Sequence, residues 1–267
     1  MGRTIDITKK PSTIDTLRRD LEALGIQGAV LVHSSLSQVG WIVGGAVAMI
    51  EALTLALGRE GTLVMPTHSA DLSDPAGWVN PPVPESWWAI IRDAMPAFDP
   101  RHTPSWSVGR LPELFRTQAH VLRSGHPQVS FAARGPHAST ITVSHDLDFG
   151  LGDGSPLARL YDLDGSILLL GVGHDRDTSL HLAEYRAEWP GKKTVMQGAP
   201  LLVDGRRSWV EFQDIVLCED DFVRLGEDYE RDGGPVRRGR VGSAPALLIP
   251  QRRLVDYAVG WMERNRR

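Results

Sequence analysis

Cysteine is nearly absent from this sequence of 267 residues, because Cys218 is the only one. A single cysteine excludes an internal disulfide framework and a zinc site built from clustered cysteines. It also suits a reducing compartment, so we expect a cytoplasmic protein. Basic residues are not in excess either: 29 Lys and Arg face 33 Asp and Glu, for a net charge of −4. Nonspecific nucleic-acid binding needs a basic surface, and we therefore expect no nucleic-acid partner.

Long hydrophobic runs are also missing. The longest runs from Ala46 to Leu57, is interrupted by Glu51, and is too short to cross a bilayer, which takes about 20 apolar residues. The first ten residues contain no apolar stretch, so no secretory signal is expected. Asp6 stands where N-myristoylation requires Ser or Thr. These features predict a protein with no membrane partner.

Several common enzyme motifs do not occur. The sequence has no GxxxxGK[ST] phosphate loop, no GxSxG nucleophile elbow and no HExxH helix. It also lacks the [QR]xxGx[GA] turn with which the large N-acetyltransferase superfamily binds acetyl-CoA. If this protein uses acetyl-CoA, it does so with another architecture.

Alternating strand and helix patterns predict a layered α/β fold. Apolar residues make up 42% of the chain and charged residues 23%, which is typical of a globular protein and not of a disordered one. The apolar run 166–172 does not alternate with polar residues, as expected for a strand buried on both faces. In such folds the functional site lies at the carboxyl ends of the strands. The expected strands are 29–33, 62–65 and 166–172, and helices are expected at 14–24, 46–57 and 178–187.

The pattern changes after Lys193. Two alternating segments flank Asp204-Gly205, a dipeptide typical of hairpin turns, and predict an antiparallel β element. An acidic helix near 219–231 and an arginine-rich helix from Pro250 follow. No Ser/Gly linker interrupts the chain. We therefore expect a single domain over 1–267, an α/β/α layered fold with a mostly buried central sheet and an antiparallel β extension in its C-terminal third.

The segment from His68 to Trp106 has few strand signals. It contains seven prolines and four of the eight tryptophans, and is expected to be a long loop. Loops of this length in compact domains are usually functional. The simpler interpretation is that each tryptophan packs the loop onto the core.

Three segments stand out, 33–40, 126–135 and 171–184, and two of them carry groups suited to chemistry. The first, from His33 to Gly40, leaves a predicted strand and offers hydroxyls and backbone amides that can bind phosphates or pantetheine. The second contains His181 and Glu184, three residues apart and so on one helical face. A histidine beside a carboxylate at the edge of a sheet suits a general base. The alternative is a histidine that only packs within a core helix.

A metal site is the weaker interpretation of the second segment. His174, Asp175, Asp177 and His181 could supply ligands, but their spacing matches no established metal motif, and no metal is expected. Asp177 or Thr178 is expected to cap the helix that carries His181.

Seven segments, in order between about Ser12 and Tyr257, closely resemble the aminoglycoside 3-N-acetyltransferase family. They are HSSLSQVGWIVGG, NPPVPESWW, PAFDPRHTPSWSVGRLPELFR, VLRSGHPQVSFAARG, LGDGSPLARLYDLDG, LLLGVGHDRDTSLHLAEYR and WVEFQDI. The resemblance implies a fold separate from the common N-acetyltransferase fold. It also implies acetyl transfer from acetyl-CoA to the 3-amino group of a 2-deoxystreptamine aminoglycoside, and hence antibiotic resistance.

The resemblance also implies roles for individual residues. His181 would be the general base, Glu184 would orient it or stabilise its charged form, and Thr178 would donate a hydrogen bond to the oxyanion. His174 is given no catalytic role. The residues expected to bind acetyl-CoA are His33, Ser34, Ser35, Leu36, Val39 and Gly40, with Ser105 and Phe131 at the thioester end of the cofactor cleft.

The expected reaction is direct transfer in a ternary complex. An aminoglycoside amine is mostly protonated at neutral pH, and histidine, whose ordinary pKa is about 6.5, can remove that proton. The free amine then attacks the thioester, and the resulting oxyanion needs fixed donors. Cys218 ends the apolar segment 215–218, so we expect a packed, inert thiol and no acetyl-cysteine intermediate.

A polycationic substrate calls for an acidic site. Acids stand at nine positions between Glu211 and Asp232, against two arginines, and such a surface would attract cations. A solvated helix face would explain most of them equally well, but Glu211 and Asp214 have strand spacing. The residues expected to contact substrate are Asp71, Asp74, Asp153, Glu211 and Asp214.

Two other functions stay open at this point. The same chemistry could act on a different amine, or the chain could be a non-catalytic protein that binds CoA or cations. The oligomeric state is expected to be a monomer or a homodimer.

Overall fold

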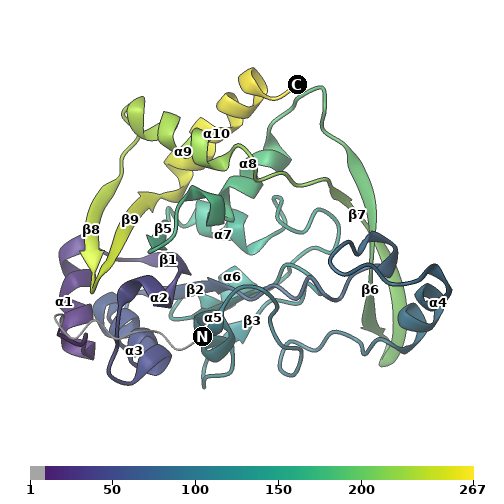
Figure 1. The fold of residues 1–267 in the computed structure, drawn as a ribbon, viewed down its shortest axis with the longest axis horizontal. Helices are drawn as coiled ribbons and strands as arrows, with labels where there is room; N and C mark the ends of the chain where they lie inside the picture. Colours follow the sequence, from purple (N-terminus) through teal and green to yellow (C-terminus); the bar gives the residue numbers. More distant parts are fainter. Residues whose placement is uncertain (1–9) are drawn as a thin grey trace.

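The centre of the molecule is a seven-stranded mixed sheet (Figure 1). The structure is a computed structural model that describes residues 10–267. The strands are ordered β3-β4-β2-β1-β5-β9-β8. β1 pairs in parallel with β2 and β5, and every other neighbouring pair is antiparallel. The strands are β1 (Ala29–Ser34), β2 (Thr62–Pro66), β3 (Leu122–Arg123), β4 (Phe131–Arg134), β5 (Ser166–Leu170), β8 (Arg237–Val241) and β9 (Ala244–Pro250).

Both faces of this sheet are buried under helices. In β1, Leu31 packs into one hydrophobic cluster, whereas Val30 and Val32 pack into another on the opposite face. This alternation explains why the central strands are apolar at almost every position. One face is covered by α1 (Ile14–Leu24), α3 (Gly45–Leu57) and α5 (Arg110–Arg116). The other is covered by α6 (Ala138–Thr142), α7 (Pro156–Asp162), α8 (Ser179–Arg186), α9 (Phe222–Arg231) and α10 (Gln251–Asn265). The predicted layered α/β fold is confirmed.

The ends of α1 follow from its local sequence. Thr13 caps the helix and forms a reciprocal capping box with Thr16. The helix ends at Gly25, whose backbone has φ 83°, and the N–H of Gly25 returns to the carbonyls of Leu21 and Glu22. Both ends agree with the prediction from the sequence.

The predicted antiparallel extension is a long hairpin away from the sheet. β6 (Thr194–Val203) and β7 (Arg206–Ile215) pair along their whole length around Asp204-Gly205, and Figure 1 shows them on the right side of the molecule. The segment 68–106 packs against this hairpin, since the N–H of Phe98 donates to the carbonyl of Pro200 at 2.9 Å.

The prediction of one long loop over 68–106 was wrong in part. The segment includes the short helix η1 (Pro75–Gly77) and the ten-residue helix α4 (Glu85–Ala94). Arg207 fixes α4 to the hairpin, because its Nε donates to the carbonyl of Met95, the C-cap of α4, at 3.1 Å. Trp87 and Trp106 are more than half exposed, so these two do not pack the segment onto the core.

The predictions about a secretory signal and N-myristoylation fall mainly on residues 1–9, which lie outside the described residues. Over residues 10–267, no helix combines the length and apolarity needed to cross a membrane.

Candidate active site

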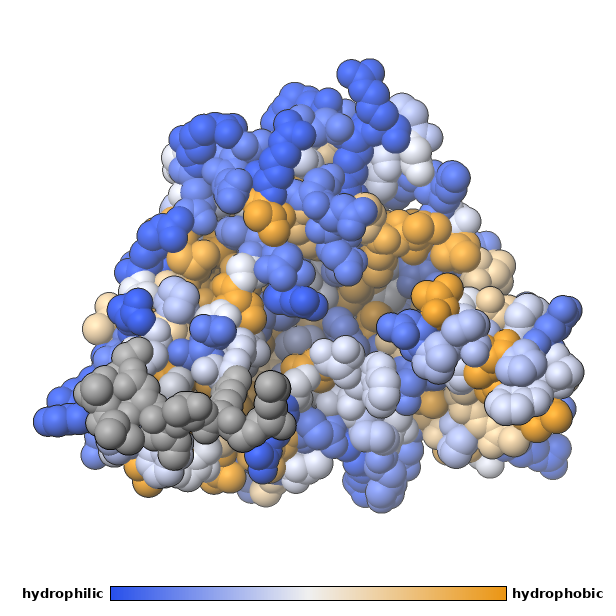
Figure 2. Space-filling view, viewed as in Figure 1, coloured by the Kyte–Doolittle hydropathy of each residue, from blue (hydrophilic) through white to orange (hydrophobic). Residues whose placement is uncertain are grey.

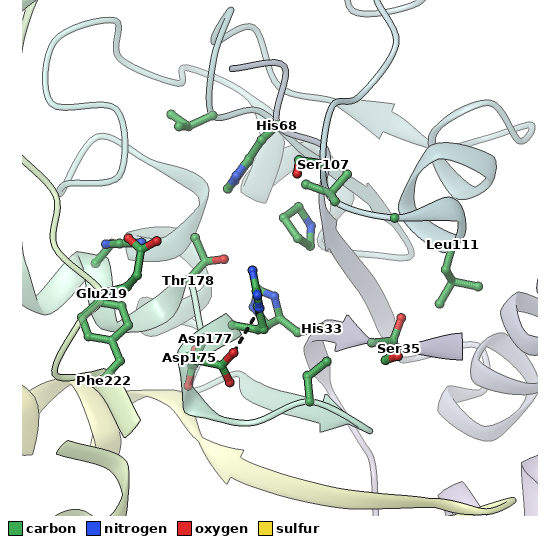
Figure 3. Close-up of a pocket in the computed structure, with 18 of the residues that line it drawn as sticks. His33, Ser35, His68, Ser107, Leu111, Asp175, Asp177, Thr178, Glu219 and Phe222 are labelled. Atoms are coloured by element: carbon green, nitrogen blue, oxygen red, sulfur yellow. Dashed lines mark hydrogen bonds and ion pairs between the residues drawn. The ribbon is translucent and has the colours of Figure 1, made fainter. Parts of the chain in front are cut away.

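A cavity of about 600 Å³ opens at the carboxyl ends of β1, β2 and β5. Figure 2 shows the molecule hollowed at the centre of this face, and Figure 3 shows the side chains that line the cavity. Its walls come from the ends of β1 and β2, the short helices α2 (Leu36–Val39) and η2 (His174–Arg176), and the first turns of α5, α8 and α9. The cavity therefore lies where the sheet topology places ligand sites. Its lining comprises His33–Ser37, Pro66, His68, Ser107–Leu111, Val129, Leu151, Val172, Asp175–Thr178, His181, Leu217, Glu219 and Phe222.

His181 and Glu184 form a hydrogen-bonded pair in this wall. The Nδ1 atom of His181 lies 2.5 Å from Oε2 of Glu184, one helical turn further along α8. The carboxylate is completely buried, while the imidazole is 14% exposed and lines the cavity. Because a carboxylate accepts at Nδ1, the Nδ1 proton stays in place and Nε2 is the nitrogen free to take a proton. The side-chain pairing predicted from the spacing is therefore present.

The turn before α8 places a hydroxyl in the cavity. Thr178 is the N-cap residue, but its side chain makes no capping hydrogen bond. Asp177 does that instead, since its Oδ1 accepts the N–H of Ser179 at 3.0 Å. Burial raises the pKa of Asp177 to about 6. The Thr178 hydroxyl lies between His33 and Glu219 in Figure 3, available to a ligand.

The loop after β1 lines the cavity as expected, but only in part. Ser34, Ser35 and Leu36 reach it, together with His33. Val39 does not, because its side chain is completely buried in the core. Gly40 lies outside the lining as well. The hydroxyls of Ser35 and Ser37 are 2.7 Å apart, and Ser37 also lines the cavity although it was not singled out from the sequence.

Ser105 and Phe131 are not among the residues that line the cavity. Ser105 is engaged by Glu113, whose Oε2 accepts from both its N–H at 2.7 Å and its hydroxyl at 2.6 Å. Phe131 is completely buried, with its ring edge-on to His68 at a centroid distance of 5.3 Å. The residues that reach the cavity from these segments are Ser107 and Val129. For Ser105 and Phe131, contact with the cofactor stays a prediction.

Two uncharged imidazoles face the cavity. His33 and His68 line it, and within the part of the chain that the structure describes their Nε2 atoms have no hydrogen-bond partner. Burial, and then the proximity of His181, lowers the pKa of each to about 3. They are therefore neutral at physiological pH and can offer a donor or an acceptor without carrying charge.

None of the five acids expected to contact substrate lines this cavity. Asp74 is paired with Arg92 at 2.7 Å. Asp214 is buried, and its Oδ1 accepts the Tyr185 hydroxyl at 2.5 Å. Burial raises the pKa of Asp214. Asp153 is paired with Arg186 at 2.8 Å. Asp71 and Glu211 are exposed.

The cavity has its own charged residues, which were not assigned a binding role from the sequence. Its carboxylates are Asp175, Asp177 and Glu219, and its guanidinium groups are Arg110 and Arg176. Asp175 accepts a hydrogen bond from Nε of Arg176 at 3.1 Å. Glu219 lies within the acidic stretch 211–232. It was not expected to contact substrate, because the strand spacing of Glu211 and Asp214 favoured those two residues instead. Cations and anions therefore both find complementary charge here.

The prediction of a packed Cys218 thiol was wrong. Cys218 is exposed and lies in the connection between β7 and α9 rather than in a strand. Its backbone N–H contacts the His181–Glu184 pair, because it donates to Oε1 of Glu184 at 3.0 Å. The apolar residues before it misled the prediction because the chain leaves the hairpin at Ile215.

Among residues 10–267, no group of three or more His, Cys, Asp or Glu side chains is arranged to hold a metal ion. His174 is buried beside acids, with its Nε2 3.4 Å from Oε1 of Glu230. The contact with Glu230 gives His174 a structural role that does not involve His181.

Comparisons with known proteins agree on one family. A family model described as aminoglycoside 3-N-acetyltransferase matches residues 31–263. The SPbeta prophage-derived aminoglycoside N(3')-acetyltransferase-like protein YokD of Bacillus subtilis is 44% identical over 99% of this chain and 97% of its own. The crystal structure of that protein has a TM-score of 0.94, covering 98% of this chain and 97% of its own.

Two liganded structures are also similar. AAC-IIIb in a binary complex with CoASH is 34% identical, with a TM-score of 0.85, over 96% of this chain and 97% of its own. AAC-VIa bound to sisomicin is 32% identical, with a TM-score of 0.86, over 96% and 98%. The match of the family model and the identity over nearly whole chains establish that this chain belongs to the aminoglycoside 3-N-acetyltransferase family, a family of acyltransferases.

Proposed function

We propose that this protein transfers the acetyl group of acetyl-CoA to the 3-amino group of a 2-deoxystreptamine aminoglycoside, with His181 as general base. The observation that carries the proposal is the His181–Glu184 pair, whose imidazole lines the same cavity as the loop after β1. Its relatives include proteins captured with CoASH and with sisomicin, and these support the two ligand classes. We expect the enzyme to act in the cytoplasm, as a monomer or homodimer, and to confer resistance.

The geometry supports direct attack in a ternary complex. Glu184 holds the Nδ1 proton of His181, so Nε2 accepts a proton from the substrate ammonium group. The free amine then forms a bond to the thioester carbon, and the carbonyl oxygen becomes an oxyanion. The Thr178 hydroxyl, which caps no helix, is the donor we assign to this oxyanion. Collapse breaks the carbon–sulfur bond, and the thiolate leaves as the amide forms. The attacking nitrogen loses its second proton in this step, that proton neutralises the thiolate, and His181 releases the first proton to solvent.

The charges of the cavity fit this pair of ligands. Arg110 and Arg176 can bind the phosphates of CoA, and the hydroxyls of Ser34 and Ser35 can bind its pantetheine amides. Glu219 is the carboxylate best placed for a substrate ammonium group. The neutral imidazoles of His33 and His68 add polar groups to the cavity without repelling a cation.

A thiol-release assay with acetyl-CoA and a panel of amines tests the proposal. The panel should contain aminoglycosides with and without a 3-amino group, together with simple diamines, and NMR should locate the acetyl group in the product. Release only with acceptors that carry the 3-amino group is expected. Preference for a different amine would redirect the substrate assignment. No release with any amine, together with no thermal shift by acetyl-CoA or aminoglycoside, would overturn the enzymatic proposal.

A further inference from the structure

The buried carboxylate of Glu184 has a partner from a distant part of the chain. Nη1 of Arg266, the residue after α10, donates to Oε1 of Glu184 at 2.5 Å. Oε2 of the same carboxylate is the atom that meets Nδ1 of His181. Glu184 therefore bridges a guanidinium group and the proposed general base. The catalytic scheme above does not use this second contact.

Arg266 is itself held firmly. Its Nε and Nη2 atoms bind the two carboxylate oxygens of Asp221 at 2.8 and 2.6 Å, and Nη2 also donates to the carbonyl of Cys218 at 2.8 Å. The guanidinium lies 5.0 Å from the ring centroid of Trp189. Only 8% of the side chain is exposed.

These contacts keep the guanidinium charged despite its burial. Burial alone lowers the pKa of Arg266, but the hydrogen bonds and charges of Asp221 and Glu184 outweigh this effect and raise it. The two carboxylates flank one cation, so a fully buried Glu184 has its charge compensated on the side away from His181.

We propose that Arg266 is a positioning residue for acetyl transfer, which fixes Glu184 so that one carboxylate oxygen faces Nδ1 of His181. The inference rests on the proposed role of His181. A buried carboxylate without a cation is costly, and the planar guanidinium fixes the orientation of its partner as well as its charge. Without Arg266, Glu184 turns, and His181 loses the acceptor that holds its tautomer.

The first test is steady-state kinetics of Arg266→Met, which keeps an apolar stem beside Trp189 but removes the charge. We expect kcat to fall by roughly 10- to 100-fold, as for other residues that orient a catalytic ligand, with the KM of both substrates unchanged. Arg266→Lys keeps the charge without the planar fork and should restore part of kcat. Arg264→Met removes an exposed arginine of α10 and should leave kcat unchanged. A normal kcat in folded Arg266→Met would overturn the proposal.

A double-mutant cycle separates positioning from packing. If Arg266 acts through Glu184, then Arg266→Met should lower kcat little further in a Glu184→Gln background. Equal losses of kcat in the two backgrounds would mean that Arg266 only stabilises the fold, and would contradict the inference.

A readout without turnover distinguishes this inference from the proposed function. In proton NMR, the Nδ1 proton of His181 should give a strongly downfield signal that is lost in Glu184→Gln. The signal should shift or broaden in Arg266→Met and stay unchanged in Arg264→Met. An identical signal in Arg266→Met would refute the positioning role even if the wild type acetylates no amine. Inactive wild type with the expected NMR changes would refute only the proposed function.

Discussion

Glu184 accepts a hydrogen bond from Nδ1 of His181 at 2.5 Å across a single turn of α8. The imidazole reaches the cavity, but the carboxylate is completely buried. The pair therefore presents Nε2 of His181 to a ligand and shields the carboxylate of Glu184 from water.

Removing the His181 imidazole should abolish proton transfer without affecting the cofactor. For His181→Ala we expect kcat to fall at least about 100-fold, the lower end for loss of a general base. Calorimetry should find nearly unchanged acetyl-CoA affinity. The matched control is His102→Ala, an exposed histidine outside the cavity lining. Near-normal turnover in His181→Ala would remove this residue from the mechanism.

Cys218→Ala should retain full kcat and KM. The thiol is exposed and takes no part in our scheme, whereas the contacts of Cys218 to Glu184 and Arg266 are made by its backbone and survive the change. Mass spectrometry after incubation with acetyl-CoA alone should detect no acetyl group on the wild-type protein. Acetyl trapped on Cys218 at a rate that matches turnover would replace direct transfer by a two-step route.

Glu219 should matter more to substrate binding than the acids expected from the sequence. A charge-assisted hydrogen bond contributes about 1.5–3 kcal/mol, so Glu219→Gln should raise the aminoglycoside KM about tenfold and leave the acetyl-CoA KM alone. The wild-type KM should rise with added salt, and that of the variant should rise less. Glu211→Gln is the matched control, because Glu211 is exposed and lies outside the cavity. A larger effect of Glu211→Gln would mean that substrate binds at the β6–β7 hairpin and not at Glu219.

Acid should unfold this protein at a mild pH. Burial lowers the pKa of His33, His68 and His126 to about 3 and that of His145 to about 4. In the unfolded chain they protonate near pH 6.5. Below that pH the unfolded state binds more protons, so the free energy of unfolding falls as the pH falls, by about 1.4 kcal/mol per unit for each histidine. Burial also lowers the pKa of His174, which adds a fifth histidine to this trend. Asp177, with its pKa raised to about 6, and Asp214, whose pKa burial also raises, oppose the trend, but they are two groups against five. Urea unfolding at pH 7.5, 6.5 and 5.5 measures the slope.

His126 provides the variant for that measurement. Its Nδ1 accepts the N–H groups of Gln128 and Val129, each at 3.1 Å, so protonation would break both contacts. Asn can place its side-chain oxygen near the Nδ1 position and does not titrate. We therefore expect the stability of His126→Asn to depend less steeply on pH, by about one proton. Equal slopes for the variant and the wild type would mean that other groups cause the acid sensitivity.

Much of the fold was predictable because its signals are local. The Thr13 cap and Gly25 stop define α1, Asp204-Gly205 defines the hairpin, and the unbroken apolar run at 166–172 marks a strand buried on both faces. Four strands of the sheet, β3, β4, β8 and β9, were not predicted. β8 is mostly exposed and rich in arginine, so its pairing with β9 leaves no hydrophobic pattern.

The sequence by itself determined the pairing of His181 with Glu184, because the two are three residues apart and any helix brings them together. Only the tertiary structure decided which charges surround them. Asp214 was expected to face substrate but is bound by Tyr185, Cys218 was expected to be packed but is exposed, and Arg266 reaches Glu184 from 82 residues away. These contacts depend on where α10 and the β7–α9 connection pack against α8. Residue spacing along one element cannot encode such an arrangement, since it arises from the burial of separate elements against one another.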